Sequence, residues 1–336
     1  MASQLLIQDL LRRDIKPKKK LWSYRKKFLS KTVVDQGIND DNYKEYLPDF
    51  RYFKLHPLNT AFGKWIDDKL TMKLILEPFS EFVPQYYFHF FEGKILKLPE
   101  CPGGYNGTVD DILKILHEKK RLACKKVRGG GGDGFFMIRE KGEQTFINKT
   151  AVDRNELSER IQSLDNYIVT EYVTAHPLLK KISPDSPNSM RLVVIHPDDG
   201  NSFIAAAYLR FGTKHTRLME VQAQDGIISK IDIINGQFSD SKRRGEDGLF
   251  RDCRVHPDTG REITGTVPHW SLIKEKVEEI SNYLPQLRFM GFDIAVTEGG
   301  FKILEINSLP GLTLQHFFPL LKDERTGNFF KSRIEN

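Results

Sequence analysis

The segment 292–308 constrains the fold more than any other part of the chain. It reads FDIAVTEGGFKILEINS, two apolar runs around a turn at 298–300, which is typical of a β-hairpin. Asp293 lies early on the first run, and Glu305 and Asn307 lie at i and i+2 on the second, so the latter two point to one face. Because unpaired charge inside an apolar sheet is very costly, something cationic must compensate them. Such oxygen ligands suit Mg²⁺, and an internal ion pair with Lys or Arg is the alternative.

A glycine run follows a basic stretch in the middle of the chain. Residues 125–128 read KKVR, and Gly129 to Gly132, Asp133 and Gly134 come next. Glycine lets backbone N–H groups approach an anion closely, so the pattern suits a triphosphate. It is not a P-loop, because GxxxxGK[ST] is absent. A disordered surface loop is the alternative.

Two single charges stand in other apolar runs. Arg191 in MRLVVI needs an anionic partner, either a salt bridge or a phosphate oxygen held by its planar fork of donors. Glu171, near the end of YIVTEYV, is placed to accept a hydrogen bond from an exocyclic amine such as that of adenine, although a structural role is the better reading for it alone. Lys214 and Arg217 are candidates for binding a carboxylate or anionic acceptor, and ordinary surface cations are the alternative.

The rest of the chain alternates between helical and strand patterns. At 336 residues it is long enough for roughly two domains. Asp67 and Asp68 predict the start of a helix that Pro78 ends, and Thr108 with Asp111 predicts a capping box. Further predicted elements are, in order, strands at LAC (122–124) and FFMIRE, a helix at NELSERIQSL, strands at YIVTEYV, MRLVVI and FIAAAYLRF, and a helix at WSLIKEKVEEISNYL.

Residues 1–66 read as a helical, basic region. Its cations, from Arg12 to Lys27, favour a solvated helix face, and a patch for nucleic acid or an anionic membrane is the alternative. Trp22, Tyr24 and Phe28 are predicted to anchor its core. No signature of a nucleic-acid-binding fold is present.

Composition limits the class of protein. The chain is 39% hydrophobic and 29% charged with a net charge of +6, as expected of a soluble globular enzyme. Cys101, Cys124 and Cys253 form no Cys-x-x-Cys pair, which fits a reducing compartment. Without a signal peptide or an apolar run of about 18 to 20 residues, we expect a cytoplasmic protein.

The order of these motifs resembles the ATP-grasp superfamily over about residues 66–315. The resemblance implies an α+β ATP-grasp fold in which two α+β lobes clasp ATP, preceded by a short, mostly helical N-terminal region. The implied domains are the basic helical region 1–66, a lobe at 67–175 with the glycine-rich lid and adenine hinge, and a lobe at 176–336 with the metal-binding hairpin.

The resemblance also implies roles for individual residues. DDKLTMKLIL, CKKVRGGGGDGF, TEYV and FDIAV…KILEINSLPG carry it. The implied catalytic residues are Arg191 and Lys125. The implied nucleotide-binding residues are Lys69, Lys125, Gly130, Gly131, Gly132, Glu171, Tyr172, Val173 and His176. The implied ligands of Mg²⁺, with Mn²⁺ as an alternative, are Asp293, Glu305 and Asn307.

A closer likeness is to the sugar-transfer-associated ATP-grasp family, found with polysaccharide biosynthesis genes. EYVTAHPLLKKISPDSPNSMRLVVI and HPDTGREITGTVPHW resemble that family's signatures. Lys126 stands where the family usually has proline, which leaves open whether Lys125 or Lys126 contacts phosphate. RFGTKHTRLMEVQAQDG departs from the family pattern, so the acceptor side carries over poorly.

The function implied by the resemblance is an ATP-dependent carboxylate–amine ligase that works through an acyl phosphate. Its expected partners are a small-molecule or sugar-linked carboxylate and an amine, as in surface polysaccharide biosynthesis. A phosphotransferase using the same nucleotide site and a non-catalytic basic binding module are the alternatives. No nucleic acid is expected as a partner, and peripheral membrane contact through the basic N-terminus stays open.

Overall fold

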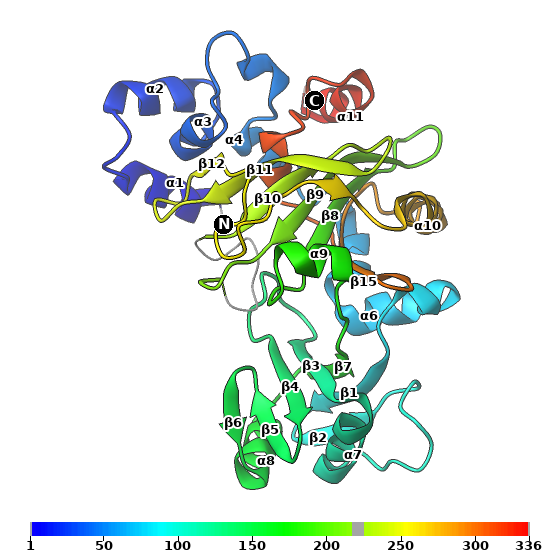
Figure 1. The fold of residues 1–336 in the computed structure, drawn as a ribbon. Coiled ribbons are helices and arrows are strands. Elements are labelled where there is room, and N and C mark those ends of the chain that lie inside the picture. The colour runs from blue at the N-terminus through cyan, green and yellow to red at the C-terminus, as the bar shows by residue number, and fades with distance from the viewer. Residues whose placement is uncertain (1, 217–224, 335–336) are drawn as a thin grey trace.

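The computed structural model describes residues 2–216 and 225–334. Two antiparallel sheets build two lobes, one below the other in Figure 1, and the N-terminal helices lie beside the upper sheet. This confirms the predicted α+β architecture with a helical N-terminal region. Within the described ranges, no helix has the length and apolarity needed to cross a bilayer.

The lower lobe contains a seven-stranded sheet in the order β2-β1-β7-β3-β4-β5-β6. Its strands are β1 (Tyr86–Phe91), β2 (Lys94–Lys97), β3 (Arg121–Lys126), β4 (Phe136–Lys141), β5 (Gln144–Ile147), β6 (Thr150–Val152) and β7 (Tyr167–Glu171). Two helices, α7 (Val109–Lys119) and α8 (Arg154–Gln162), bury Ile112, Ile115 and Ile161 in a core with Cys124 of β3. Because side chains alternate along a strand, Ala123 and Lys125 point to the opposite face, toward the upper lobe.

The upper lobe contains an eight-stranded sheet in the order β12-β11-β10-β9-β8-β14-β15, with β13 paired to β11. Its strands are β8 (Ser189–Ile195), β9 (Phe203–Phe211), β10 (Ile227–Ile231), β11 (Gln237–Arg244), β12 (Phe250–Asp252), β13 (Gly265–Thr266), β14 (Phe289–Thr297) and β15 (Gly300–Asn307). On one face, α10 (Trp270–Tyr283) buries Ile273, Val277 and Ile280. The other face packs against N-terminal and C-terminal segments, including α4 (Asp49–Leu55) and α11 (Glu324–Ile334).

Local sequence signals account for most of these elements. Thr108 and Asp111 form the predicted capping box of α7, and the side chain of Asp68 caps α6 (Lys69–Ile75). The hairpin predicted at 292–308 is confirmed as β14 and β15. By contrast, the stretch from 235 to 267 contains three strands that were not predicted, because its sequence is rich in charged residues and glycines. Strand β11 lies near the edge of the sheet and buries only Phe238 and Ser241, so its sequence shows little apolar alternation.

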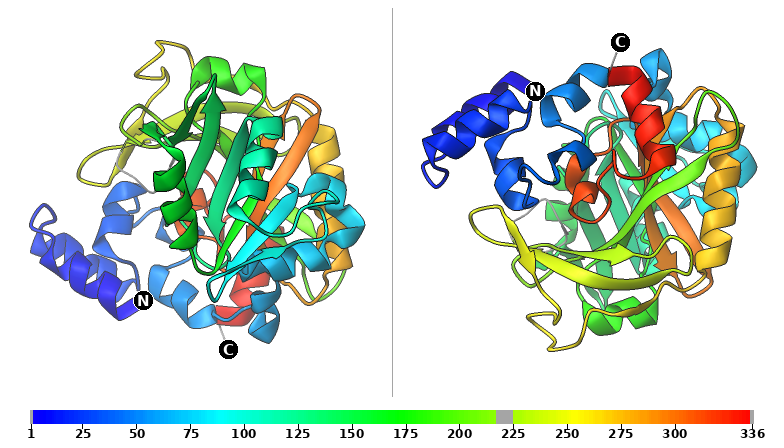
Figure 2. Two further views of the ribbon diagram at one scale, coloured as in Figure 1. Left: turned by 90° about the horizontal axis from the view of Figure 1, so that it is seen from below. Right: turned by 90° about the horizontal axis from the view of Figure 1, so that it is seen from above.

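The N-terminal region contains short helices that pack on one another and on the upper sheet. Its elements are α1 (Ala2–Leu11), α2 (Pro17–Arg25), α3 (Ser30–Asp35), η1 (Tyr43–Glu45), α4, η2 (Thr60–Gly63) and α5 (Lys64–Asp67). Phe28 is fully buried with Val33 and Ile38, as predicted for a core anchor, and Trp22 and Tyr43 pack against this cluster. Seen from above, these helices and α11 lie together at the upper sheet (Figure 2).

The remaining helices connect the two sheets or flank them. They are η3 (Glu77–Phe82), α9 (Pro177–Ile182) and η4 (Leu312–His316). The helix α6, predicted from its caps and from Pro78, ends at Ile75, and η3 follows it with Pro78 in its first turn. Both α5 and α6 contact β15, so the start of α6 lies next to the hairpin.

Asn59 fastens the N-terminal region to that hairpin. Its side chain is buried and donates to the Phe289 carbonyl at 2.7 Å while accepting from the Phe289 N–H at 3.0 Å. A third hydrogen bond, of 3.2 Å, reaches the carbonyl of Ser308 just past β15. One amide side chain therefore binds both the first residue of β14 and the residue that follows β15.

We expect Asn59→Ala to lower the free energy of unfolding by about 2 kcal/mol, because it leaves the buried N–H and C=O of Phe289 without partners. Urea denaturation of the full chain measures this. Asn155→Ala, at an exposed position of α8, is the matched control and should change stability by less than about 0.5 kcal/mol. Equal stabilities of the two variants would contradict the bracing role.

Candidate functional site

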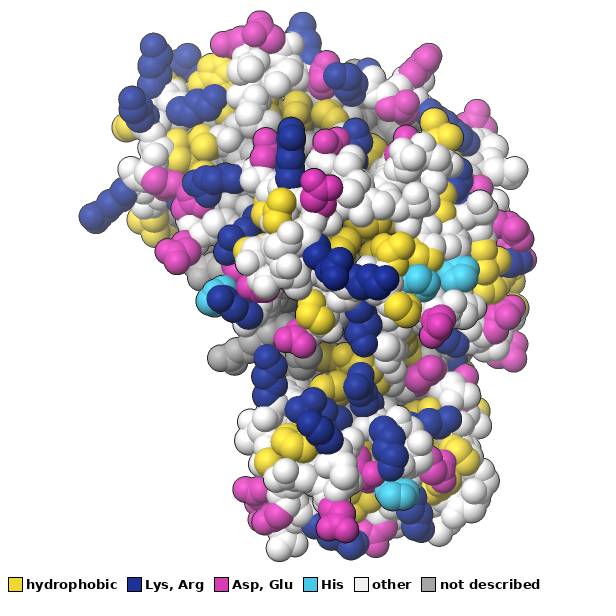
Figure 3. Space-filling view, in the orientation of Figure 1, with side chains coloured by type: hydrophobic (Ala, Val, Ile, Leu, Met, Phe, Trp, Pro, Cys, Tyr) yellow, Lys and Arg dark blue, Asp and Glu magenta, His cyan; other side chains and the backbone are white. Residues whose placement is uncertain are grey.

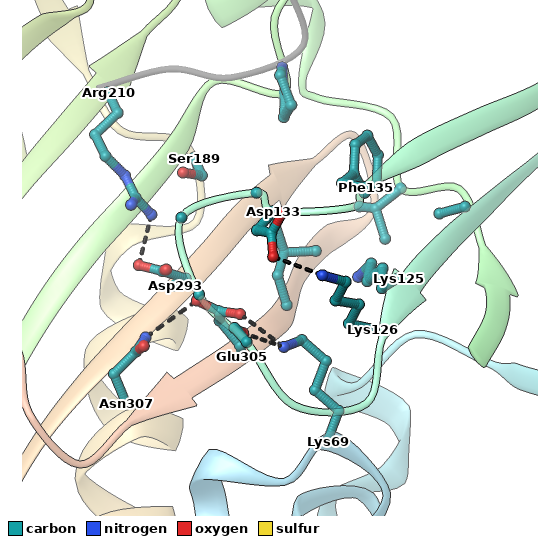
Figure 4. Close-up of a pocket in the computed structure, with 18 of the residues that line it drawn as sticks. Lys69, Lys125, Lys126, Asp133, Phe135, Ser189, Arg210, Asp293, Glu305 and Asn307 are labelled. Atoms are coloured by element: carbon teal, nitrogen blue, oxygen red, sulfur yellow. Dashed lines mark hydrogen bonds and ion pairs between the residues drawn. The ribbon is translucent and has the colours of Figure 1, made fainter. Parts of the chain in front are cut away.

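A cavity of about 540 Å³ lies between the two sheets. Figure 4 shows that its labelled side chains come from both lobes and point toward one another. Every residue to which the resemblance assigned a role, except His176, lines it. The full lining is Lys69, Ala123, Lys125, Lys126, Gly129 to Gly132, Asp133, Phe135, Glu171, Tyr172, Val173, Pro187, Ser189, Arg191, Arg210, Asp293, Leu304, Glu305, Asn307, Leu309 and Gly311.

Lys69 is placed in the cavity by the start of α6. Its backbone N–H donates to the carbonyl of Val127, and the neighbouring cap, Asp68, accepts a 2.8 Å hydrogen bond from Arg128. The end of β3 is thereby tied to the first turn of α6. The Lys69 ammonium then lies 3.2 Å from a carboxylate oxygen of Glu305 and donates to the Gly129 carbonyl at 3.0 Å. This one cation links the hairpin to the glycine run.

Lys125 and Lys126 point in different directions because they are neighbours on β3. Within the described residues Lys125 forms no ion pair, while Lys126 donates to Asp133 in the glycine segment at 2.6 Å. Burial, together with the nearby Lys69 ammonium, lowers the pKa of Lys125 to about 8 despite the attraction of Glu305 and Glu171. An unpaired cation with a depressed pKa is a candidate for binding an anion.

The glycine run forms an irregular loop over the cavity. Gly129, Gly131 and Gly132 have φ of 133°, 72° and 74°, a region that side chains with a Cβ seldom adopt. A Cβ on Gly130 would meet nothing within 4 Å, so open space adjoins the backbone there. The loop therefore offers backbone groups, without side chains, to whatever enters the cavity.

A β-bulge turns the hairpin's polar residues inward. Asp293 pairs with Glu305 and the next residue, Ile294, pairs with Ile303, so Leu304 is the extra residue of β15. Consequently Leu304 and Glu305 both line the cavity although they are adjacent. Asn307 donates to Glu305 at 3.3 Å and to the carbonyl of Gly291 at 3.4 Å.

Two arginines from neighbouring strands converge on Asp293. Arg191 of β8 lies directly opposite Asp293 of β14, with its Nε 2.8 Å and its Nη2 3.2 Å from the two carboxylate oxygens. Arg210 of β9 places its Nη2 2.5 Å from the first of these oxygens. A Cβ on Gly291 would lie 2.5 Å from Arg191 Nη1, so glycine at 291 makes room for the guanidinium. That buried Nη1 has no hydrogen-bond partner among the described residues.

The carboxylates of Asp293, which is buried, and Glu305, which is partly buried, are therefore already compensated by protein cations. Burial disfavours the charged form of Glu305, but the Lys69 ammonium and the hydrogen bonding within the pair hold its pKa at about 2. Burial raises the pKa of Asp293 against the opposing pull of Arg191 and Arg210, and the negative Glu305 adds to the rise. The ion-pair alternative is thus present in the structure, and so is the cavity beside it.

The hairpin's donor set suits a hard cation. Glu305, Asp293 and Asn307 offer only oxygen ligands on one cavity wall, as Mg²⁺ prefers. Among the described residues no group of three or more His, Cys, Asp or Glu side chains is arranged to hold a metal ion. A metal bound here would keep water or ligand oxygens in its coordination shell. The ligand roles of Asp293, Glu305 and Asn307 stay a prediction.

The segment after β7 contributes a partly apolar wall. Tyr172 and Val173 line the cavity, as do Ala123 and Leu304. The Glu171 carboxylate already accepts a 3.2 Å hydrogen bond from the Gln85 backbone N–H. This contact favours the structural role predicted for Glu171 over the role of binding an exocyclic amine. His176 lies outside the cavity lining, where it caps α9 by accepting from the N–H of Leu178.

Arg210 is the clearest residue of the candidate site that the sequence patterns did not lead us to predict. It is a single charge in the apolar strand FIAAAYLRF, the same signal that identified Arg191, so it was detectable. Ser189, Phe135 and Leu309 carried no such signal. Of the two further candidates for binding an acceptor, Lys214 is exposed, with its N–H bonded to Asp258. Arg217 lies outside the described residues.

Several solved structures are similar to this chain at low sequence identity. D-alanyl-alanine synthetase A from Vibrio cholerae O1 biovar eltor is 13% identical, with 83% of this chain and 66% of that one covered and a TM-score of 0.47. D-alanine–D-alanine ligase from Bacillus anthracis is 12% identical (95% and 83% covered, TM-score 0.43). N5-carboxyaminoimidazole ribonucleotide synthetase from Thermotoga maritima is 11% identical (81% and 49%, TM-score 0.41), so this chain spans about half of its length.

Sequence comparison gives a more specific result. No curated protein matches the chain significantly. The model of the sugar-transfer-associated ATP-grasp family, in contrast, matches residues 53–318, which include both sheets and the whole cavity lining. Because this match covers most of the chain, the protein belongs to the sugar-transfer-associated ATP-grasp family.

Proposed function

We propose that the protein is an ATP-dependent ligase that joins a carboxylate to an amine through an acyl phosphate. The observation that supports this most is the cavity in which an unpaired lysine, a glycine loop and the hairpin's carboxylates face one another. That combination offers cationic and backbone groups for a polyphosphate on one wall and oxygen ligands for its metal on the other.

The cavity has a chemically distinct region for each part of ATP. Ala123, Val173 and Leu304 give an apolar surface for the adenine base, next to the backbone that follows β7. Lys69, Lys125 and the glycine loop supply positive charge and N–H groups for the phosphates. Since Lys69 already reaches both the loop and Glu305, a small movement of its ammonium would bring it to a phosphate oxygen.

Asp293, Glu305 and Asn307 would hold Mg²⁺. When bound, the metal would offset negative charge on the phosphates. Arg191 and Arg210 oppose the effect of burial on Asp293 and favour its ionised form, the form that binds a metal. The Nη1 of Arg191 is buried against Gly291 and has no hydrogen-bond partner among the described residues, so a shift of the guanidinium would bring it to the transferring phosphoryl group.

The chemistry needs no nucleophilic side chain. In the first step an oxygen of the substrate carboxylate attacks the γ-phosphorus, and the bond to ADP breaks to give an acyl phosphate. In the second, the amine attacks the carbonyl carbon, loses a proton and expels inorganic phosphate. Positioning and fixed charge dominate such phosphoryl transfer, and closure of the glycine loop would keep water from the intermediate.

The proposed substrates are a small or sugar-linked carboxylate and an amine used in surface polysaccharide or related small-molecule biosynthesis, and the family's description as sugar-transfer associated supports the sugar-linked part. The decisive experiment measures ADP release by the full chain with pairs of amino acids, uronic acids and amino sugars, followed by mass analysis. ADP release that requires both an acid and an amine, with an amide product, supports the ligase. Phosphate retained on a hydroxyl identifies a kinase, and absence of turnover with every pair contradicts both.

Glu305→Gln is expected to reduce ATP turnover by at least about 100-fold, because the amide removes one anionic oxygen ligand while preserving shape. Steady-state ADP release measures it, and thermal unfolding confirms that the variant is folded. Glu298→Gln, exposed at the turn of the same hairpin, is the matched control and should retain full turnover. Normal turnover of Glu305→Gln would remove this residue from the proposed metal site.

Lys125→Ala should weaken ATP binding about 10- to 100-fold, since it deletes a charge-assisted contact inside the cavity. Lys126→Ala should weaken it less than about threefold, because that side chain is partly exposed and already pairs with Asp133. Calorimetric titration of both variants compares them directly. The reverse ranking would assign the phosphate contact to Lys126.

ATP affinity is expected to fall as the pH rises through about 8, the pKa of the buried Lys125 in the free protein. The lysine is charged below that pH and neutral above it, and only the charged form attracts phosphate. Near pH 8 binding should therefore take up a proton, which titrations in buffers of different ionisation enthalpy detect. Lys125→Met should show neither effect, and a wild-type response in this variant would contradict the assignment.

A further inference from the structure

The positive charge of this protein is concentrated at its N-terminus. Residues 1–31 contain ten Lys and Arg against two Asp, a net charge of +8, whereas the entire chain carries only +6. All of the chain's excess positive charge therefore lies on α2, on the start of α3 and in the loops before each of them, because α1 itself contains no Lys or Arg. The rest of the molecule, including the cavity, is close to neutral.

The two acidic residues of this segment do not neutralise its surface. Asp9 is buried, where it accepts hydrogen bonds from Tyr24, Ser30 and the N–H of Lys31. Asp14 pairs with Arg12. The exposed cations left without an acidic partner among the described residues are Arg13, Lys16, Lys18, Arg25 and Lys27.

Apolar side chains are exposed beside these cations. Ile7, Leu10 and Leu11 are 57%, 52% and 73% exposed and lie at i, i+3 and i+4 of α1, so they form one stripe on the helix. The buried Asp9 fixes the rotation of α1, with the stripe turned away from it toward solvent. Leu21 of α2, 54% exposed, lies just past the run of cations. Figure 3 shows hydrophobic and basic side chains interspersed over these helices.

We propose that this surface, composed of the four apolar residues and the five exposed cations, docks the protein on an anionic lipid membrane. Helices that lie in a membrane interface combine an apolar stripe, which enters the acyl boundary, with basic residues that contact lipid head groups. The surface has both features, and charge complementarity selects an anionic bilayer. A nucleic acid would use the cations and leave the apolar stripe in water. A second copy placed face to face would bring two strongly positive surfaces together.

Docking in this way is compatible with an open cavity. The helices α1 to α3 lie beside the upper sheet and not beside the lower lobe (Figure 1). None of the surface residues lines the cavity. Changes to this surface should therefore alter membrane binding without altering ATP turnover, which separates this proposal from the proposed ligase activity.

The test is co-sedimentation of the full-length protein with vesicles. Wild type should bind vesicles made from an equal mixture of phosphatidylcholine and phosphatidylserine, and it should bind vesicles of pure phosphatidylcholine poorly. It should dissociate from the mixed vesicles at high salt. Two variants should each weaken binding about tenfold or more. One is the double variant Ile7→Gln with Leu11→Gln, and the other changes Arg13, Lys16 and Lys18 to Glu.

Matched controls change the same chemistry elsewhere on the surface. Leu96→Gln with Ile234→Gln removes two exposed apolar side chains, and Lys94, Lys119 and Lys141 changed to Glu reverse three exposed charges. Both controls should bind vesicles like wild type. Losses equal to those of the test variants would overturn the proposal, as would wild-type binding that is indifferent to anionic lipid. If the protein does not bind vesicles but binds duplex DNA, and if Ile7→Gln with Leu11→Gln leaves DNA binding unchanged, the surface would be assigned to nucleic acid. A dimer dissociated by that variant would assign it to a second copy.

Discussion

Two carboxylates in neighbouring strands, one buried and one partly buried, place the strongest physical demand on this structure. Asp293 and Glu305 face each other across β14 and β15, where unpaired charge would cost several kcal/mol per ion. Their compensating cations come from three separate elements, with Lys69 at the start of α6, Arg191 on β8 and Arg210 on β9. Satisfying that charge therefore fixes how α6 and the strands sit around the cavity.

The two carboxylates are compensated unequally, and this difference bears on function. Asp293 forms ion pairs with two guanidinium groups. Glu305 pairs with one ammonium, that of Lys69, and accepts a hydrogen bond from the amide of Asn307. Lys69 also contacts the glycine loop, so the same cation that neutralises the hairpin sets the position of the opposite wall. A ligand entering between them would exchange these contacts for its own, because a long lysine chain moves more easily than strands held in a sheet.

Much of the fold was predictable, because its signals are local. Capping residues fixed the starts of α6 and α7, and the two apolar runs around 298–300 fixed the hairpin. The strands from 235 to 267 were missed because β11 lies near a sheet edge, where partial burial does not demand apolar alternation. Arg210 was missed although it carried the same signal as Arg191. The bulge that adds Leu304 to the cavity had no signal in the sequence.

The sequence by itself determined which side chains must find partners, because a charge inside an apolar run is costly wherever that run is buried. Asp293, Glu305 and Arg191 all stand out from their apolar neighbours on this ground alone. Only the tertiary structure decided which of these charges pair with one another. Arg191 and Asp293 are 102 residues apart and meet through the register of β8 against β14. Lys69 is the ammonium that reaches Glu305, and Lys125 has no ion pair within the described part of the chain. Such choices depend on how separate elements pack, which no local pattern encodes.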